Sequence, residues 1–167
     1  ISICFSKGLG CPMGSILVGN KDDIARARRI RKLFGGALRQ TGIVASAAQY
    51  ALENNIDRLK NDHENARQLA VGLASIDGIQ IDAERVKSNL VFFEIEVERG
   101  LASQLAGALK EQGILIGPMG RQRLRAVTHL DVGTADIEKA VERIRECMMD
   151  GFPDSPPVGH GPYSKSC

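Results

Sequence analysis

The chain has 167 residues, of which 43% are hydrophobic and 25% are charged, and its formal net charge is +2. This composition is typical of a globular protein, and the charge is too weakly basic to indicate a nucleic-acid partner. No apolar run is long enough to cross a bilayer and no secretory signal is recognisable, so we expect no membrane association and a cytoplasmic location.

A lysine lies between an apolar run and a glycine-rich loop at the start of the chain. Ile1–Phe5 predicts a strand, and Lys7 follows it, directly before the glycines and proline of residues 8–14. Because lysine is depleted inside strands and glycine and proline end them, we expect Lys7 at the mouth of the strand, where its ammonium can point into a cleft. A lysine amine can form a Schiff base with a carbonyl, and pyridoxal phosphate is the carbonyl cofactor most often held in this way. The neighbours Ser6 and Gly8 favour this interpretation over that of an ordinary surface lysine.

Three helices are predicted after a second short strand at residues 15–19. That strand argues against a dinucleotide-binding loop, which needs a helix at this point and a glycine spacing one residue shorter. The helices are predicted at residues 22–33, 41–52 and 56–74. The first carries an apolar face formed by Ile24, Ala27, Ile30 and Phe34, and its basic residues are interpreted as a solvated face. The third helix places His63 on its apolar face, where we interpret it as a packed, hydrogen-bonded side chain and not as a ligand.

From residue 77 onward, the pattern predicts a small α+β layer. Strands are expected at residues 79–81, 89–97, 113–118 and 122–128, and helices at residues 101–112 and 135–148. Thr134 is predicted to cap the last helix. Residues 150–167 are rich in proline, glycine and serine, and we expect them to be disordered.

The four cysteines show no C-x-x-C spacing, which argues against a zinc site or a thioredoxin-like motif. We therefore expect no metal site, and free thiols in a reducing compartment. Cys4 lies in the first predicted strand and is assigned to the core, whereas Cys11 is assigned to the loop.

Four segments, in the same order along the chain, resemble the low-specificity L-threonine aldolases. The first is Ser6–Ser15, which contains Lys7 within Ser-Lys-Gly-Leu-Gly. The others are Arg31–Gln40, Asp62–Ala66 and Arg125–Val132. The resemblance covers about residues 1–149 and corresponds to the C-terminal half of the family's chain. It implies an α/β fold of fold type I of the pyridoxal phosphate enzymes, of which this chain supplies the end of the large-domain sheet, helices and a small α+β domain.

The resemblance also implies a domain organisation and an activity. Residues 1–75 would belong to the large cofactor-binding domain, residues 76–149 would form the small C-terminal α+β domain, and residues 150–167 would be a tail. The family cleaves β-hydroxy-α-amino acids, such as L-threonine and L-allo-threonine, to glycine and an aldehyde. The resemblance therefore implies a pyridoxal phosphate-dependent lyase that acts on a small amino-acid substrate and forms a homo-oligomer, either a dimer or a tetramer.

The resemblance assigns roles to five residues. Lys7 would bind the cofactor covalently, and Ser6 would donate a hydrogen bond to its phosphate. Lys32 and Arg39 would offset the phosphate charge, because in the family their segment lies near the active site at a subunit interface. Arg125 would hold the substrate carboxylate, since a planar guanidinium donates two parallel hydrogen bonds to such a group.

The sequence at and just before the strand that contains Arg125 offers two further arginines. Arg121, Arg123 and Arg125 share one strand face by the period of two, and the family motif selects Arg125 among them. His129 and Asp131 follow this strand, and their spacing suggests an ion pair. We interpret that pair as structural, with His129 kept as a minor catalytic candidate.

Several parts of the family's cofactor site correspond to a region that precedes Ile1. They are the ring-stacking histidine, the aspartate that pairs with the pyridine nitrogen and the main phosphate cup. We therefore expect the chain by itself to be a poor enzyme, because a cofactor needs its phosphate, ring nitrogen and ring face held together. Two alternatives stay open: another fold-type-I enzyme, such as an aminotransferase or a hydroxymethyltransferase, and a non-catalytic chain that acts at most as a dimerisation or interaction module.

Overall fold

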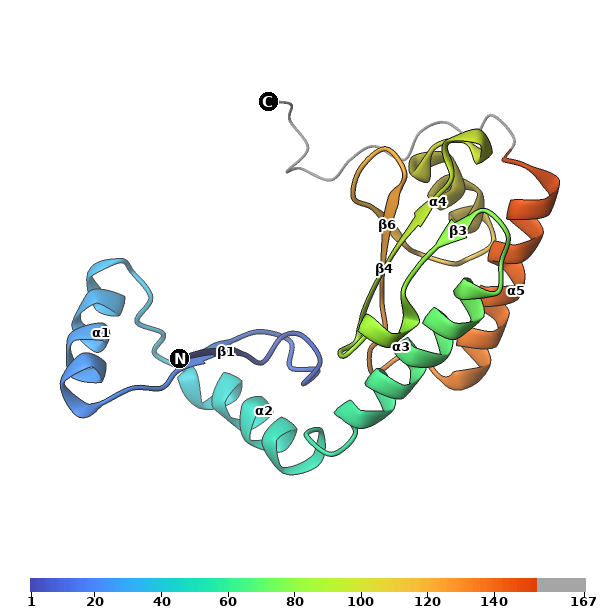
Figure 1. Cartoon of the computed structure of the whole chain (residues 1–167). Helices are drawn as coiled ribbons and strands as arrows, with labels where there is room; N and C mark the ends of the chain where they lie inside the picture. The colour runs from blue at the N-terminus through green and yellow to red at the C-terminus, as the bar shows by residue number, and fades with distance from the viewer. Residues whose placement is uncertain (153–167) are drawn as a thin grey trace. The chain divides into compact units, whose positions relative to one another are not determined.

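The computed structural model describes residues 1–152, which fall into two compact units divided between Lys60 and Asn61. Figure 1 shows the order of helices and strands along the chain. The boundary between the units falls within helix α3 (Leu59–Ala74), whose apolar residues pack into the core of the second unit. The domain boundary predicted after residue 75 stays a prediction, and the predicted disorder of the tail falls almost entirely outside the described residues.

The first unit contains two strands and two helices, as predicted. Strands β1 (Ser2–Cys4) and β2 (Ser15–Leu17) pair in antiparallel fashion and are followed by helices α1 (Lys21–Leu33) and α2 (Thr41–Asn54). Helix α1 begins after Asn20, whose side chain accepts a hydrogen bond from the backbone N–H of Asp23 at 2.9 Å. This is a common N-cap geometry, so the local sequence determines where the helix starts.

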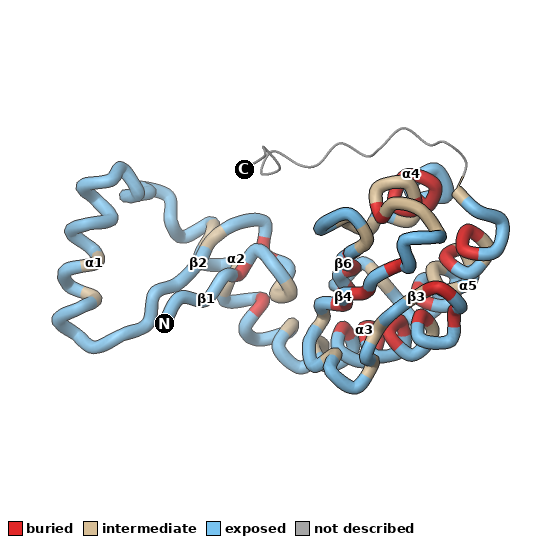
Figure 2. Tube along the Cα trace, turned by 45° about the horizontal axis from the view of Figure 1, so that its top comes forward, coloured by how far each residue is buried: buried red, intermediate tan, exposed pale blue. Residues whose placement is uncertain are grey.

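The core of the first unit is small. Its buried apolar residues are Phe5, Cys11 and Ala51. The predicted apolar face of α1 lies open, since no residue of that helix is buried and Phe34 is 83% exposed. Figure 2 shows β1, β2 and α1 almost wholly in the colour of exposed residues. The assignment of Cys4 to the core is wrong: β1 pairs only with β2 in the described part of the chain, and the thiol faces outward.

The second unit is a four-stranded antiparallel sheet covered on one face by helices. The strand order is β3 (Ile79–Gln80), β4 (Leu90–Ile95), β6 (Arg123–Val127) and β5 (Gly117–Pro118). The covering helices are α3, α4 (Ala102–Glu111) and α5 (Thr134–Asp150), and two short 3₁₀ turns span Ala83–Arg85 and Val97–Arg99. The strand predicted at residues 113–118 is shorter than expected and is reduced to β5.

Alternation along β4 and β6 separates a buried face from an open face. Val91, Phe93 and Ile95 of β4 are buried together with Leu124 and Ala126 of β6, and the three helices cover them. The intervening residues point to the other face and stay largely exposed. The sheet therefore presents a partly apolar, partly charged surface on which the predicted carboxylate-binding arginine lies.

The start of α3 has a polar inward face that the sequence did not indicate. His63 is exposed, so its assignment as a packed histidine is wrong, whereas Asp62 and Asn65 are buried. This part of the helix faces the loop after β6 and not the apolar sheet: the hydroxyl of Thr128 donates to the carbonyl of Asp62 at 2.6 Å, and the amide of Asn65 donates to the carbonyl of Val132 at 3.0 Å. A hydroxyl and a backbone carbonyl from that side thus find their hydrogen-bond partners at the start of the helix.

The last helix begins one residue earlier than a Thr134 cap would place it. Gly133 occupies the N-cap position, and its backbone N–H donates to the carboxylate of Asp136 at 2.9 Å. Thr134 is the first helical residue, and its hydroxyl donates instead to the side-chain oxygen of Asn65 at 3.2 Å. The cap prediction is therefore wrong in detail, because the threonine hydroxyl serves a contact with α3.

Candidate functional site

Lys7 lies in a tight turn between β1 and β2. The backbone N–H of Gly10 donates to the carbonyl of Lys7 at 2.8 Å, and that of Cys11 donates to the carbonyl of Phe5 at 3.0 Å. Gly10 and Gly14 have φ angles of +74° and +114°, which side chains rarely tolerate, so these glycines are required by the turn. The side chain of Lys7 is exposed, and within residues 1–152 it makes no hydrogen bond or ion pair. The backbone of Lys7 is thus constrained while its ammonium is available.

The other three residues assigned to the cofactor are also exposed. Ser6 directly precedes Lys7, Lys32 lies in the last turn of α1, and Arg39 lies in the connection before α2. The connection is shaped by Gly35 (φ +77°), and the backbone N–H of Gly36 donates to a carbonyl of α1 at 2.8 Å. In the part of the chain that the structure describes, no hydrogen bond or ion pair joins any of these three side chains to Lys7.

The arginines of β6 differ in their surroundings. Arg123 lies opposite Glu94, with 4.0 Å between its Nε and the carboxylate, and its guanidinium lies 5.1 Å from the centre of the Phe92 ring. Arg125 lies opposite Phe92 on β4 and opposite Gly117 on β5. Among the described residues its guanidinium has no ion-pair or hydrogen-bond partner. The structure therefore leaves Arg125 available on the open face of the sheet, whereas Arg123 is already engaged.

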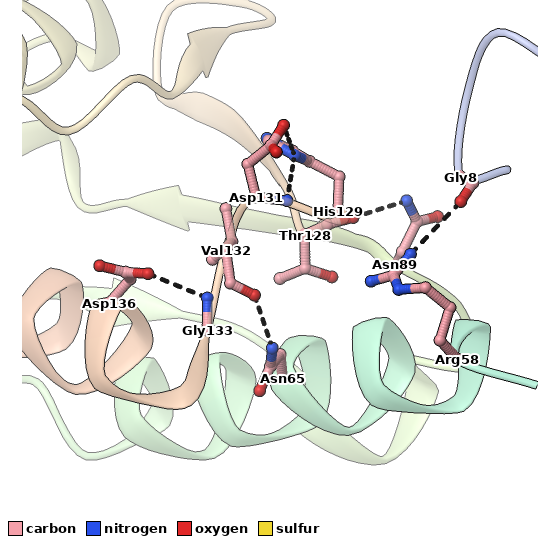
Figure 3. Close-up of polar contacts among 10 residues, drawn as sticks. All are labelled: Gly8, Arg58, Asn65, Asn89, Thr128, His129, Asp131, Val132, Gly133 and Asp136. Carbon is pink, nitrogen blue, oxygen red and sulfur yellow. Dashed lines mark hydrogen bonds and ion pairs between the residues drawn. The ribbon is translucent and has the colours of Figure 1, made fainter. Parts of the chain in front are cut away.

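In the loop after β6, the histidine and the aspartate of the predicted ion pair lie close together. Nδ1 of His129 lies 3.5 Å from the carboxylate of Asp131, whose backbone N–H also donates to Nδ1 at 3.3 Å. Figure 3 shows this pair above α3, together with the hydrogen bond from the amide of Asn89 to the carbonyl of Thr128, which is 2.9 Å long. Thr128 is buried, whereas the side chains of His129 and Asp131 are exposed. These contacts therefore shape the loop.

Two residues near the Lys7 turn were missed by sequence reasoning. Asn55 and Arg58, from the connection between α2 and α3, both donate hydrogen bonds to carbonyls of that turn. In the sequence, Asn55 indicates only an interruption between two helices. No local signal links it to the turn, because the two segments are far apart along the chain.

Within residues 1–152, no group of three or more histidine, cysteine, aspartate or glutamate side chains is placed to hold a metal ion. None of the helices in this range has the length and apolar character needed to cross a membrane.

Comparison with known proteins identifies a matching family model and several similar L-threonine aldolases. Residues 1–98 match the family model described as Beta-eliminating lyase. The chain is 42% identical over 144 residues to the low specificity L-threonine aldolase of Escherichia coli O157:H7, covering 86% of this chain and 41% of the relative. It is 36% identical over 150 residues to low-specificity L-threonine aldolase 1 of Arabidopsis thaliana, covering 89% of this chain and 42% of the relative. The chain thus spans about two fifths of the length of these relatives.

Solved structures share the fold. A putative L-allo-threonine aldolase from Listeria monocytogenes matches with a TM-score of 0.66 and 24% identity, over 89% of this chain and 43% of that one. A structure of SPT with PLP matches with a TM-score of 0.68 and 22% identity, over 89% of this chain and 39% of that one. These likenesses confirm the predicted α/β fold of the fold-type-I pyridoxal phosphate enzymes over part of their chains.

Proposed function

Because the chain belongs to the beta-eliminating lyase family, we propose that the protein containing it cleaves L-threonine and L-allo-threonine to glycine and an aldehyde, with pyridoxal phosphate as cofactor. The observation that carries this proposal is the turn at Lys7. It holds the lysine backbone in place and leaves the ammonium without an internal partner. That combination suits an amine that must bind a carbonyl carbon and release it again.

The exposed residues of the first unit fit the two functional groups of this cofactor. Its aldehyde requires an amine, which Lys7 offers, and its phosphate requires donors and cations. Ser6 offers a hydroxyl, and Lys32 and Arg39 offer cations that are not neutralised by an acidic side chain within residues 1–152. When bound, pyridoxal phosphate supplies an electron sink for cleavage of the bond between Cα and Cβ.

Two residues of the chain would bind the cofactor and the substrate. Lys7 would hold the cofactor covalently and yield it to the incoming amino group. Arg125 would bind the substrate carboxylate through two parallel hydrogen bonds and so fix the orientation of the amino acid. Its place on an open sheet face, without an internal partner, supports this role.

Assembly is part of the proposal. Several apolar side chains at the end of helix α1 are exposed: Ile30 at 51%, Leu33 at 81% and Phe34, directly after the helix, at 83%. Exposed apolar patches of this kind mark surfaces that another chain or domain covers. We therefore propose that the active protein is a homo-oligomer, and that the isolated chain, which lacks this cover, has little activity.

The test uses a segment swap. Residues 1–150 replace the matching segment of the E. coli relative, so that the remaining parts of an aldolase are supplied. Reduction with borohydride in the presence of pyridoxal phosphate, followed by peptide mapping, should label Lys7. Release of acetaldehyde from L-threonine should be lost in Lys7→Arg and kept in Lys21→Arg, which changes an exposed lysine of α1.

Three results would count against the proposal. A label on a different lysine would remove the assigned role of Lys7. A labelled protein that transfers amino groups or one-carbon units but releases no acetaldehyde would place the chain with another fold-type-I reaction. A swap that assembles but neither takes up the label nor cleaves threonine would favour the non-catalytic alternative.

A further inference from the structure

The two central carbonyls of the Lys7 turn each accept a hydrogen bond from a distant side chain. The amide of Asn55 donates to the carbonyl of Leu9 at 2.8 Å. Nη1 of Arg58 donates to the carbonyl of Gly8 at 3.5 Å, a contact shown in Figure 3. Both donors lie in the short connection that follows α2. The turn is therefore held from outside as well as by its own Gly10 to Lys7 hydrogen bond.

The position of Asn55 makes it suited to this contact. It follows the last residue of α2, and its backbone N–H closes the helix by donating to the carbonyl of Ala51 at 2.8 Å. Its side chain is left to reach the turn, where it is partly buried. Leu9 packs against the buried cluster that contains Ala51, so the apolar contact and the amide hydrogen bond fix the same peptide.

Further contacts hold the Lys7 turn close to α2 and to the start of α3. A Cβ added at Gly8 would lie 3.0 Å from Cδ2 of Leu59, so the glycine allows the turn to approach the start of α3 closely. On the other side, the thiol of Cys11 donates to the carbonyl of Ala47 in α2 at 3.4 Å. The backbone around Lys7 is thus attached to α2 and to the connection after it.

We propose that Asn55 is a positioning residue for Lys7, and that Arg58 assists it through the neighbouring carbonyl. This inference rests on the proposed role of Lys7. The reactive amine itself has no partner among the described residues, so its placement depends on the backbone that carries it. A fixed backbone limits the region that the flexible side chain reaches, and an unpaired amine can meet a carbonyl there without first breaking an ion pair.

The chain offers a matched control. Asn54 is the preceding residue, and its amide also donates to a backbone carbonyl at 2.8 Å, that of Tyr50, but within α2. Asn55→Ala and Asn54→Ala therefore remove the same chemical group from neighbouring positions, and only the first removes a contact with the turn. The φ of Asn55 is −107°, which alanine accepts without strain. Asn55→Gln keeps an amide donor and serves as the conservative variant.

The first measurement is amide hydrogen exchange in the swapped protein without cofactor. Loss of one hydrogen bond is worth about 0.5–1.5 kcal/mol, so exchange at Gly10 and Cys11 should be about two- to tenfold faster in Asn55→Ala. Asn54→Ala should leave both amides unchanged. Equal exchange in all variants would overturn the proposal, and so would acceleration by both alanine variants alike.

The second measurement is the rate at which pyridoxal phosphate and cyanoborohydride modify individual lysines. Lys7 should react more slowly in Asn55→Ala, with recovery in Asn55→Gln, while Lys21 reacts as before. An equal change at both lysines would indicate general loosening of the unit and would overturn the proposal. If the cofactor instead labels a lysine other than Lys7 in the unmodified protein, the proposed function fails, and the exchange data alone then decide whether Asn55 holds the turn.

Discussion

Replacing Arg125 by alanine should raise KM for L-threonine in the swapped protein. Its guanidinium lies on the open face of β6, between Phe92 and Gly117, and no described residue pairs with it. Removing it therefore deletes no hydrogen bond or ion pair among the described residues. Any loss of activity should therefore come from the lost contact with the substrate carboxylate.

The magnitude follows from the type of interaction. A hydrogen bond to a charged group is worth about 1.5–3 kcal/mol, which corresponds to a roughly 10- to 150-fold lower kcat/KM. Arg123 is the matched control on the same face. Its ion pair with Glu94 is long, 4.0 Å, and both side chains are about half exposed (55% and 53%). Arg123→Ala should therefore lower the free energy of unfolding by less than about 1 kcal/mol and leave KM nearly unchanged.

The assay is steady-state release of acetaldehyde from L-threonine, with the fraction of bound cofactor measured in each variant. Arg125→Lys should recover only part of the lost kcat/KM, because an ammonium cannot donate two parallel bonds to the carboxylate. An unchanged kcat/KM in Arg125→Ala would refute the assignment of Arg125 as the residue that binds the substrate carboxylate. A larger loss of kcat/KM in Arg123→Ala would refute it too and would indicate that Arg123 binds the carboxylate.

Three further predictions concern packing, a thiol and the phosphate side of the cofactor. Gly72→Ala should lower the free energy of unfolding by about 1 kcal/mol, because the new Cβ would lie 2.6 Å from a methyl group of Val141 and this overpacking outweighs the gain in helix propensity. Chemical denaturation measures this cost in the single variant. In the double variant with Val141→Ala, which lacks those methyl groups, the cost should disappear. Burial raises the pKa of the Cys147 thiol above its ordinary 9.0. Iodoacetamide should therefore modify exposed Cys4 well before Cys147, and the free energy of unfolding should fall as the pH rises through 9.0, because the unfolded chain then releases the Cys147 proton first. Arg39→Gln should raise the Kd for pyridoxal phosphate about tenfold by loss of a charged contact, and an unchanged Kd in a fluorescence titration would remove Arg39 from the site.

The parts of this fold that the sequence predicts are those with local causes. Asn20 and the acidic residues after it start α1, and the positive φ angle of Gly35 ends it. Alternation of apolar residues predicts β4 and its buried face. The glycine-rich turn at Lys7 is likewise local, because the glycines must adopt left-handed conformations within a few residues of the lysine.

The parts that the sequence did not predict depend on partners far along the chain. Asp62 and Asn65 are buried where the loop after β6 meets the start of α3: the hydroxyl of Thr128 donates to the backbone carbonyl of Asp62, and the amide of Asn65 donates to the carbonyl of Val132. Helical periodicity alone favoured His63 for that position. Asn55 illustrates the same limit, since its partner, the carbonyl of Leu9, belongs to another element. Hydrophobic patterns do not report which buried carbonyl needs a donor.

The small core of the first unit gives these long-range hydrogen bonds more influence on Lys7. In the second unit, one continuous apolar cluster joins the sheet to three helices, and the loss of one polar contact leaves that cluster intact. The buried apolar residues of the first unit are only Phe5, Cys11 and Ala51, and two of them flank the Lys7 turn. Where apolar burial is slight, a hydrogen bond worth about 1 kcal/mol is a large part of what orders the backbone. A partner that covers the exposed face of α1 would add the missing burial, so cofactor binding at Lys7 should strengthen together with assembly.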